Sequence, residues 1–236
     1  MKDIKHIISF SGGKDSTAML LMMIEDGWQI DKIVCVDTTK EFPQMYEHIK
    51  KVQEYIKPLE IEIISFDFDY YLSDYIKTKG KHKGKKGYGF PDFRNRWCTA
   101  QKSAAVKRIA RAFKGEIIQY HGIAVDEPKR LEKNKGRNIR YPLAEMNITE
   151  AQALQYCYDK GFDWGGLYKK FTRVSCWCCP MSRIGELRIL YNEFPNLWKE
   201  LEEMDRKSYR EFRPDYTVDE LTVRFTEERE KLEELK

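Results

Sequence analysis

The sequence lacks any apolar segment that could cross a lipid bilayer. Its longest strictly apolar run is the seven residues from Ala18 to Ile24, whereas a membrane-spanning helix needs about 20. The opening MKDIKHIISF does not have the pattern of a secretory signal, because Asp3 interrupts the lysines and no small-residue cleavage site follows. We therefore expect a cytoplasmic protein without a membrane segment.

A strong charge of one sign is absent too. The 42 lysines and arginines nearly balance the 38 aspartates and glutamates, which leaves a net charge of +4. A charge this small does not mark the whole chain as a nucleic-acid-binding protein. Disorder of the whole chain is also excluded, because 42% hydrophobic and 13% aromatic residues supply enough apolar surface for a core.

What the sequence does contain is an alternation of strand-like and helix-like segments. The strands are expected at 4–10, 31–37, 60–66 and 116–123, and the helices between them at 15–25, 43–56 and 100–113. This order predicts an α/β fold with an open, doubly wound and mainly parallel sheet. We expect the α/β domain to span residues 1–145.

The remainder, residues 146–236, is expected to form a helical appendage. Thr149 and Gln152 have the spacing of a capping box, and a last helix is expected from Thr217 to Lys236. Three cysteines of this part stand within four positions. The appendage therefore carries a cysteine cluster that needs its own explanation.

The segment SGGKDST lies where the first strand leads into the first helix. Helix N-termini offer unpaired amides and a positive dipole end, so a phosphate group is expected to bind there. Lys14 adds a point charge, and Asp15 is expected to hold Mg²⁺, to cap the helix or to orient Lys14. The spacing matches neither a Walker loop nor a dinucleotide-binding fingerprint. The residues expected to bind the cofactor, phosphate or Mg²⁺, are Ser11, Gly12, Gly13, Lys14, Asp15, Ser16 and Thr17.

This loop resembles the pyrophosphate-binding loop of the ATP pyrophosphatase, or adenine nucleotide α-hydrolase, superfamily. Three further segments narrow the resemblance to the phosphoadenylyl-sulfate (PAPS) reductase family. They are Asp37-Thr38-Thr39-Lys40-Glu41-Phe42-Pro43, Arg96-Trp97-Cys98-Thr99 with Lys102, and Gly122-Ile123 with Asp126, Glu127 and Arg130. The resemblance covers roughly residues 4 to 185 and implies a domain that binds an adenine nucleotide.

The chain departs from the reductases of that family in two features. It keeps the loop that enzymes splitting ATP into AMP and pyrophosphate share, and it has no cysteine after Cys179. The resemblance therefore implies Mg²⁺-ATP as substrate, Lys14 and Asp15 as catalytic residues, and an adenylylated acceptor from which sulfur displaces AMP. The acceptor would be tRNA or DNA, and a protein would donate the sulfur. The alternatives are a sulfonucleotide reductase and a nucleotide-sensing or nucleic-acid-binding module without turnover. The oligomeric state stays open.

Further nucleotide-binding residues are expected around the loop. Asp37 and Thr38 follow the second strand at the carboxyl edge of the sheet, where nucleotides bind in open α/β folds. The competing interpretation is that Asp37 only caps the turn into the next helix. The other residues expected to contact nucleotide lie in or directly beside the segments that resemble the family: Arg94, Lys102, Gly122 and Arg130.

The cysteines indicate a metal site. Cys176 and Cys179 have C-x-x-C spacing, and Cys98 lies in a segment that resembles the family. With no histidine within four residues of these cysteines, an all-thiolate site is expected, holding a [4Fe-4S] cluster or, alternatively, zinc. The fourth ligand is Cys178 or Cys157. Cys35, within an apolar strand, is expected in the core.

The stretch from Lys77 to Lys86 contains six lysines and no acidic residue. Its glycines and its lack of an apolar face predict a mobile surface loop. Three functions remain open for it: a lid over nucleotide phosphates, a nucleic-acid-binding site, or a solvated loop. The small net charge favours the lid over the nucleic-acid site by a narrow margin.

Overall fold

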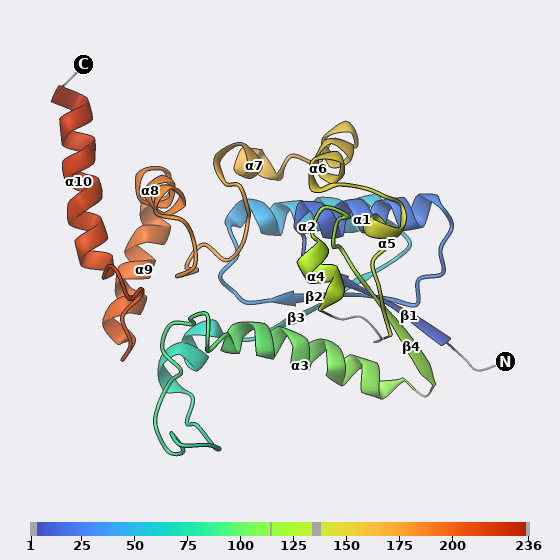
Figure 1. Cartoon of the computed structure of the whole chain (residues 1–236), viewed down its shortest axis with the longest axis horizontal. Coiled ribbons are helices and arrows are strands. Elements are labelled where there is room, and N and C mark those ends of the chain that lie inside the picture. Colours follow the sequence, from blue (N-terminus) through green and yellow to red (C-terminus); the bar gives the residue numbers. More distant parts are fainter. Residues whose placement is uncertain (1–3, 114, 134–137, 235–236) are drawn as a thin grey trace. The chain divides into compact units, whose positions relative to one another are not determined.

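The structure is a computed structural model and describes residues 4–113, 115–133 and 138–234 (Figure 1). Asp3 and Lys236, the residue at which the last helix was expected to end, lie outside the described residues. The chain divides into two compact units. Unit 1 comprises Met1–Asp37, Glu41–Phe66 and Gln101–Val174, and unit 2 comprises Thr38–Lys40, Asp67–Ala100 and Ser175–Lys236.

Unit 1 is built on a parallel sheet of five strands in the order β3-β2-β1-β4-β5. The strands are β1 (Ile4–Phe10), β2 (Lys32–Asp37), β3 (Ile61–Ser65), β4 (Glu116–His121) and β5 (Ile139–Arg140). This confirms the predicted α/β class and four of the strands. The fifth has only two residues, too few for a periodicity to show in the sequence.

Helices cover both faces of this sheet, which explains the apolar strands. α1 (Lys14–Glu25) and α2 (Pro43–Tyr55) lie on one face, and α3 (Trp97–Ala112) lies on the other (Figure 1). Ile7, Val34 and Val106 form the centre of the core beneath α3. These helices match the predicted ones to within three residues at either end.

The strand order reverses direction at β1. The chain moves from β1 to β2 and β3 on one side, and later returns to place β4 on the other side. The loops after β1 and β4 therefore lie where the strand order reverses, and in open α/β sheets ligands bind at the carboxyl ends of the strands at such a point. The segment SGGKDST follows β1 at this position.

The division into units differs from the predicted boundary at residue 145. The segment with α6 (Glu150–Asp159), η2 (Trp164–Gly166) and α7 (Leu167–Lys170) belongs to unit 1, because α6 packs against α1 and η2 packs against α2. Residues 67–100 belong to unit 2. The predicted capping box of α6 is confirmed: Thr149 and Gln152 bond to each other's backbone amides.

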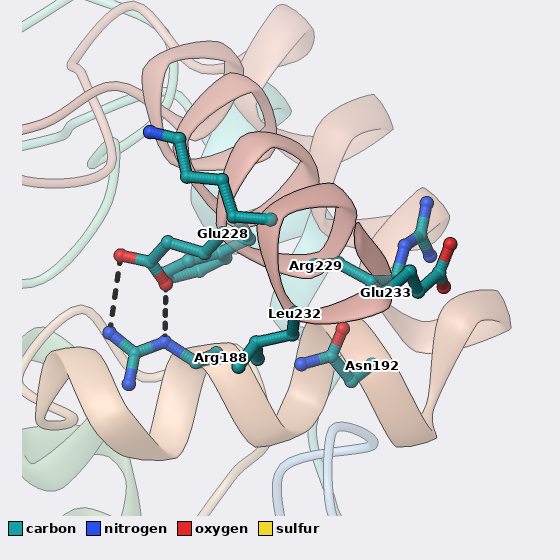
Figure 2. Close-up of a pocket in the computed structure, with 8 residues that line it drawn as sticks. Arg188, Asn192, Glu228, Arg229, Leu232 and Glu233 are labelled. Atoms are coloured by element: carbon teal, nitrogen blue, oxygen red, sulfur yellow. Dashed lines mark hydrogen bonds and ion pairs between the residues drawn. The ribbon is translucent and has the colours of Figure 1, made fainter. Parts of the chain in front are cut away.

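Unit 2 contains η1 (Tyr70–Asp74), α8 (Ile184–Glu193), α9 (Pro195–Lys207) and α10 (Val218–Glu234). Tyr191, Trp198 and Phe225 pack together between the last three helices. A cavity of about 630 Å³ lies between α8 and α10, beside the Arg188–Glu228 ion pair (Figure 2). Within the described part of the chain, no helix is both long and apolar enough for a membrane span.

Candidate functional site

The loop after β1 is shaped by contacts on its inner side. Gly12 has a φ of +75°, and a Cβ there would lie 2.8 Å from the Sδ of Met45. The indole Nε1 of Trp164 donates a hydrogen bond of 2.7 Å to the carbonyl oxygen of Gly12. Only glycine combines this backbone conformation with such close packing, so the loop has one defined shape.

The three predicted hydroxyl donors of the loop have different surroundings. Ser11 is exposed, and its hydroxyl lies 3.0 Å from that of Ser16, which also donates to the carbonyl oxygen of Gly13. Thr17 is 0% exposed, and its hydroxyl lies 3.0 Å from the Nε2 of His48. Ser11 is therefore placed to face a ligand, whereas Thr17 supports the loop from below.

Lys14 and Asp15, the predicted catalytic residues, form a partly buried ion pair at the start of α1. The Lys14 Nζ lies 2.8 Å from the Asp15 carboxylate and 3.5 Å from that of Glu150. Burial raises the pKa of the Asp15 carboxyl, and the neighbouring Lys14 offsets part of that rise. Glu150 and Glu127 raise this pKa further, which shows that negative charge is concentrated here.

Asp15, Glu127 and Glu150 bring their carboxylates together. One oxygen of each lies within 4.8 Å of the others. Among the described His, Cys, Asp and Glu residues, no other group of three or more has this spacing. Glu127 precedes α4 (Pro128–Glu132), Glu150 begins α6, and the Asp126 carboxylate accepts a 3.0 Å bond from the Glu150 amide. Carboxylate oxygens are the ligands that Mg²⁺ prefers.

Gly122 brings the end of β4 against the loop after β1. A Cβ at this position would lie 2.7 Å from the backbone carbon of Asp15 and 2.7 Å from the amide nitrogen of Ser16. Real Cβ atoms do not approach backbone so closely, so any larger residue would push the two segments apart. Gly122 therefore lies in close contact with the loop after β1, and its expected contact with nucleotide stays a prediction.

Three buried polar atoms near the end of β4 have no hydrogen-bond partner in the structure: His121 Nε2, Glu127 Oε1 and Tyr141 Oη. Leaving a buried polar atom unpaired costs about 1–3 kcal/mol. Burial, and then the charge of Arg130, lower the pKa of His121. A polar ligand or ordered water bound at this edge of the sheet would supply the missing partners.

The other predicted nucleotide-binding residues of unit 1 have protein partners. The Asp37 carboxylate accepts hydrogen bonds from Tyr46 at 3.0 Å and from Ser65 at 3.3 Å. Lys102 pairs with Glu41 at 3.3 Å, and Arg130 pairs with Glu127. Arg130 thus contacts the carboxylate group directly, while Asp37 is held by neighbouring strands and α2.

Thr38 and Arg94 lie in unit 2. Thr38 is buried, with its hydroxyl 3.1 Å from the Sγ of Cys176. The exposed Arg94 bonds through its amide to the Asp92 carboxylate at 2.7 Å. Beside Thr38, Lys40 is 3% exposed, and its ammonium lies 2.8 Å from the Asp69 carboxylate.

The four cysteines predicted to bind metal all belong to unit 2. Cys178 is buried, and Cys98, Cys176 and Cys179 are half-buried. Among the described residues no three of these thiols have their sulfurs within 4.8 Å of one another. Both a [4Fe-4S] cluster and zinc stay predictions for this set.

Cys157 and Cys35 have other surroundings. The Cys157 thiol lies 3.5 Å from the carbonyl oxygen of Lys14, and burial raises its pKa to about 12. It packs beneath α1 in unit 1, whereas the other predicted ligands belong to unit 2. Burial likewise raises the pKa of Cys35 to about 12, in agreement with its predicted place in the core.

A family model describing the phosphoadenosine phosphosulfate reductase domain matches residues 5–182. The match includes the loop after β1, the carboxylate group and all six cysteines. The chain belongs to this family. Its resemblance to the family, seen first in four short segments, is thereby confirmed.

Two further comparisons place this family member among known proteins. It is 26% identical over 216 residues to an uncharacterized protein of Methanocaldococcus jannaschii, covering 85% of this chain and 41% of that protein. The chain thus spans less than half of that relative's length. A solved structure described as a "predicted subunit of tRNA methyltransferase" from the same organism aligns with 82% of this chain and 89% of its own, at 14% identity and a TM-score of 0.32.

Two residues at the loop of this family member were missed by sequence reasoning. Glu150 joins the carboxylate group, and its only signal was its place in the first turn of a capped helix. Tyr168 was not among the expected site residues, yet its hydroxyl accepts a 2.9 Å bond from the Lys14 amide. Such contacts over more than one hundred residues leave no periodic pattern in the sequence.

Proposed function

We propose that this protein binds ATP with Mg²⁺ on the loop Ser11–Thr17 and transfers the AMP moiety to an acceptor, releasing pyrophosphate. A bond forms between an acceptor oxygen and the α-phosphorus while the bond from that phosphorus to the bridging oxygen breaks. Pyrophosphate then leaves with the electron pair of that bond. Sulfur from a donor protein would afterwards displace AMP from the acceptor. Nucleic acid, tRNA or DNA, is the acceptor class we propose.

The carboxylate group at the start of α1 carries the proposal. Three carboxylates, Asp15, Glu127 and Glu150, face two cations, Lys14 and Arg130, in partly buried surroundings. The excess of negative charge favours a divalent cation over a bare phosphate. When bound, Mg²⁺ would neutralise the charge that develops on the departing pyrophosphate.

The residues of the chain supply binding and orientation around that ion. Ser11 and the first amides of α1 offer donors to phosphate oxygens, and Lys14 adds its charge once phosphate draws it from Asp15. The unpaired atoms of His121 and Tyr141 lie at the end of β4 and just after β5. They are suited to bind a polar part of the nucleotide.

Calorimetry with Mg²⁺-ATP tests this proposal. Lys14→Ala and Asp15→Ala should each weaken ATP binding, whereas Lys50→Ala, on the exposed face of α2, should not. Unchanged affinity in both loop variants would refute the binding site. With acceptor present, pyrophosphate should be released, and steady production of ADP would contradict cleavage at the α-phosphorus.

A sulfonucleotide reductase is the second candidate function, and the matched family model favours it. The intact loop SGGKDST weighs against this candidate, because it is the loop that enzymes splitting ATP into AMP and pyrophosphate share. Sulfite released from phosphoadenylyl sulfate in the presence of a thiol reductant would establish it. If this assay releases no sulfite and the protein binds ATP, the results would favour adenylylation.

We further propose that Cys98, Cys176 and Cys179 with Cys178 hold a [4Fe-4S] cluster in unit 2. The donor set is purely thiolate, and three of these side chains are half-buried, which suits iron-sulfur ligation. Anaerobically prepared protein should absorb near ~400 nm and contain iron. Cys176→Ser or Cys179→Ser should abolish both signals, and Cys35→Ser should keep them. Equal iron in all three variants would refute this ligand set.

A further inference from the structure

Residues 75–89 form an ordered hairpin in unit 2, which can be followed in Figure 1 as the teal excursion between β3 and α3. Ile76 pairs with Lys86, and backbone hydrogen bonds join Lys77 to Lys85 and Gly84. The sequence predicted a mobile loop here because glycines and lysines offer no apolar face. The backbone bonds replace the missing apolar face as the source of order.

The base of the hairpin is fixed to the rest of unit 2. The amides of Tyr88 and Gly89 donate to the carbonyl oxygens of Tyr71 and Leu72 in η1, each at 2.9 Å. A Cβ on Gly87 would lie 2.3 Å from the Leu72 carbonyl oxygen. The glycines of this segment therefore serve close packing and turns, and no hinge is evident at the base.

Stacked aromatic rings stiffen the same base. Tyr88 stacks on Tyr75 with ring centroids 5.2 Å apart, and on Trp97 at 5.7 Å. Tyr209 donates a 2.9 Å hydrogen bond to the Tyr88 carbonyl oxygen, and the ammonium of Lys77 lies over both rings, at 4.8 Å from Tyr209 and 5.6 Å from Tyr88. Lys77 is thereby used internally.

The remaining lysines of the hairpin have no such use. Lys79, Lys81, Lys83, Lys85 and Lys86 are all exposed, and none of them forms an ion pair with a described acidic residue. Between Asp74 and Asp92 the chain contains no acidic residue. The hairpin therefore presents five positive charges that no described acidic side chain pairs with.

Exposed aromatic rings accompany these charges. Tyr209 is 60% exposed beside Lys77, and Tyr70, which contacts Tyr71 and Tyr75 edge-on, is 47% exposed. Unpaired lysines together with exposed tyrosines are the groups that bind single-stranded nucleic acid, through phosphate charge and base stacking. A free nucleotide would need far fewer cations than five.

We infer that the hairpin at residues 75–89, with Tyr70 and Tyr209, is a binding surface for single-stranded nucleic acid. Binding there does not need ATP, so it stands or falls independently of the nucleotide chemistry proposed above. If both proposals hold, the hairpin recruits the polymer that the loop after β1 activates.

Fluorescence anisotropy of the full chain with a labelled single strand of about 16 nucleotides tests the inference. The quadruple variant Lys81→Ala, Lys83→Ala, Lys85→Ala, Lys86→Ala should bind at least about tenfold more weakly at ~50 mM salt, and its salt slope should fall by roughly 0.7 for each phosphate that the variant no longer neutralises. The matched control replaces four exposed lysines elsewhere, Lys50, Lys57, Lys107 and Lys199, and should bind like the unaltered protein. Tyr209→Phe should keep affinity, whereas Tyr209→Leu should bind severalfold more weakly.

Three outcomes would overturn the inference. The quadruple variant and the control could show equal affinity and equal salt slope, which would make the hairpin a solvated surface. The variant could lose affinity for ATP while retaining the oligonucleotide, which would make it a nucleotide lid. Finally, the unaltered protein could bind vesicles containing phosphatidylserine but no oligonucleotide, and the variant could lose the vesicle binding. The hairpin would then be a membrane contact.

Discussion

Lys14 in unit 1 and Lys83 in unit 2 carry the same ammonium group under opposite conditions. Lys14 is buried and contacts two carboxylates, in a loop where backbone, rings and charges pack against one another. Lys83 is exposed at the turn of a hairpin and has no acidic partner among the described residues. The first arrangement suits a small, precisely shaped polyanion with a metal ion, and the second suits the summed charge of a polymer.

This comparison has a measurable consequence. Single atoms should matter at the loop, because every group there is held by several partners, whereas single lysines should matter little on the hairpin. The four predictions below test the sensitivity of the loop, beginning with the largest expected effect.

One methyl group at Gly122 should have the largest effect. Gly122→Ala places a Cβ 2.7 Å from the backbone of Asp15 and Ser16, so the free energy of unfolding should fall by about 1–3 kcal/mol and ATP binding should be lost. Chemical denaturation and calorimetry measure both. The matched variant Gly185→Ala, where no atom lies within 4 Å of the new Cβ, should retain stability. Equal stability of the two variants would show that the loop and β4 are not tightly packed.

The pH dependence of stability should reveal His48 beneath the loop. Burial lowers the pKa of His48 to about 3, while an unfolded chain has a histidine pKa near ~6.5. Between these values the unfolded state takes up a proton that the folded state does not. His48 therefore stabilises the fold most above pH ~6.5, and this contribution falls by up to about 1.4 kcal/mol per unit as the pH drops towards 3.

Chemical denaturation at about pH 7.5 and about pH 5 measures this loss of stability in the unaltered protein and in His48→Gln. The variant should lose less stability on acidification, by roughly 2 kcal/mol. His82→Gln, on the exposed hairpin, should behave like the unaltered protein. An equal pH dependence in all three would mean that His48 is solvated in the folded state.

Much of unit 1 could be predicted because its signals are local. A strand, two glycines and a helix stand side by side in the chain, so the position of the loop follows from a few adjacent residues. The contacts of Glu150 and Tyr168 with Lys14 could not be predicted. They depend on how α6 and α7 pack against α1. Each helix shows only its own apolar periodicity in the sequence, which does not reveal the helix that it packs against.

In unit 2 the composition of residues 75–89 predicted their positive charge but did not predict that they form a hairpin. Six lysines indicated a cationic surface, and the structure keeps five of them exposed. Its order comes from backbone hydrogen bonds and from glycines with positive φ at Gly80, Gly84, Gly87 and Gly89. Glycine permits disorder and tight turns alike, so composition alone could not separate the two.

A smaller effect is expected at the carboxylate group. Glu150→Gln keeps the shape of the side chain but removes one of three negative charges, so Mg²⁺ affinity in the presence of ATP should fall by about tenfold, or ~1.4 kcal/mol. Titration calorimetry with Mg²⁺ measures this change. Glu47→Gln removes an exposed charge of α2 that pairs with Lys50 and should leave Mg²⁺ affinity unchanged. If Glu150→Gln does the same, the ion is not held by this group.

The smallest effect concerns Tyr168 and has the opposite sign. Its hydroxyl accepts the Lys14 amide hydrogen bond, one of the donors that a phosphate at the start of α1 would use. Phosphate must therefore displace Tyr168 or forgo that amide. Tyr168→Phe frees the amide while the ring keeps its edge-on contact with Trp164, so pyrophosphate should bind about five- to tenfold more tightly, equivalent to about 1–1.4 kcal/mol. The matched variant Tyr158→Phe, on α6, should leave the affinity unchanged. Weaker binding of pyrophosphate to Tyr168→Phe would contradict this prediction and would mean that the Tyr168 hydroxyl contacts the ligand. The hydroxyl would then serve as an anion donor in place of the Lys14 amide.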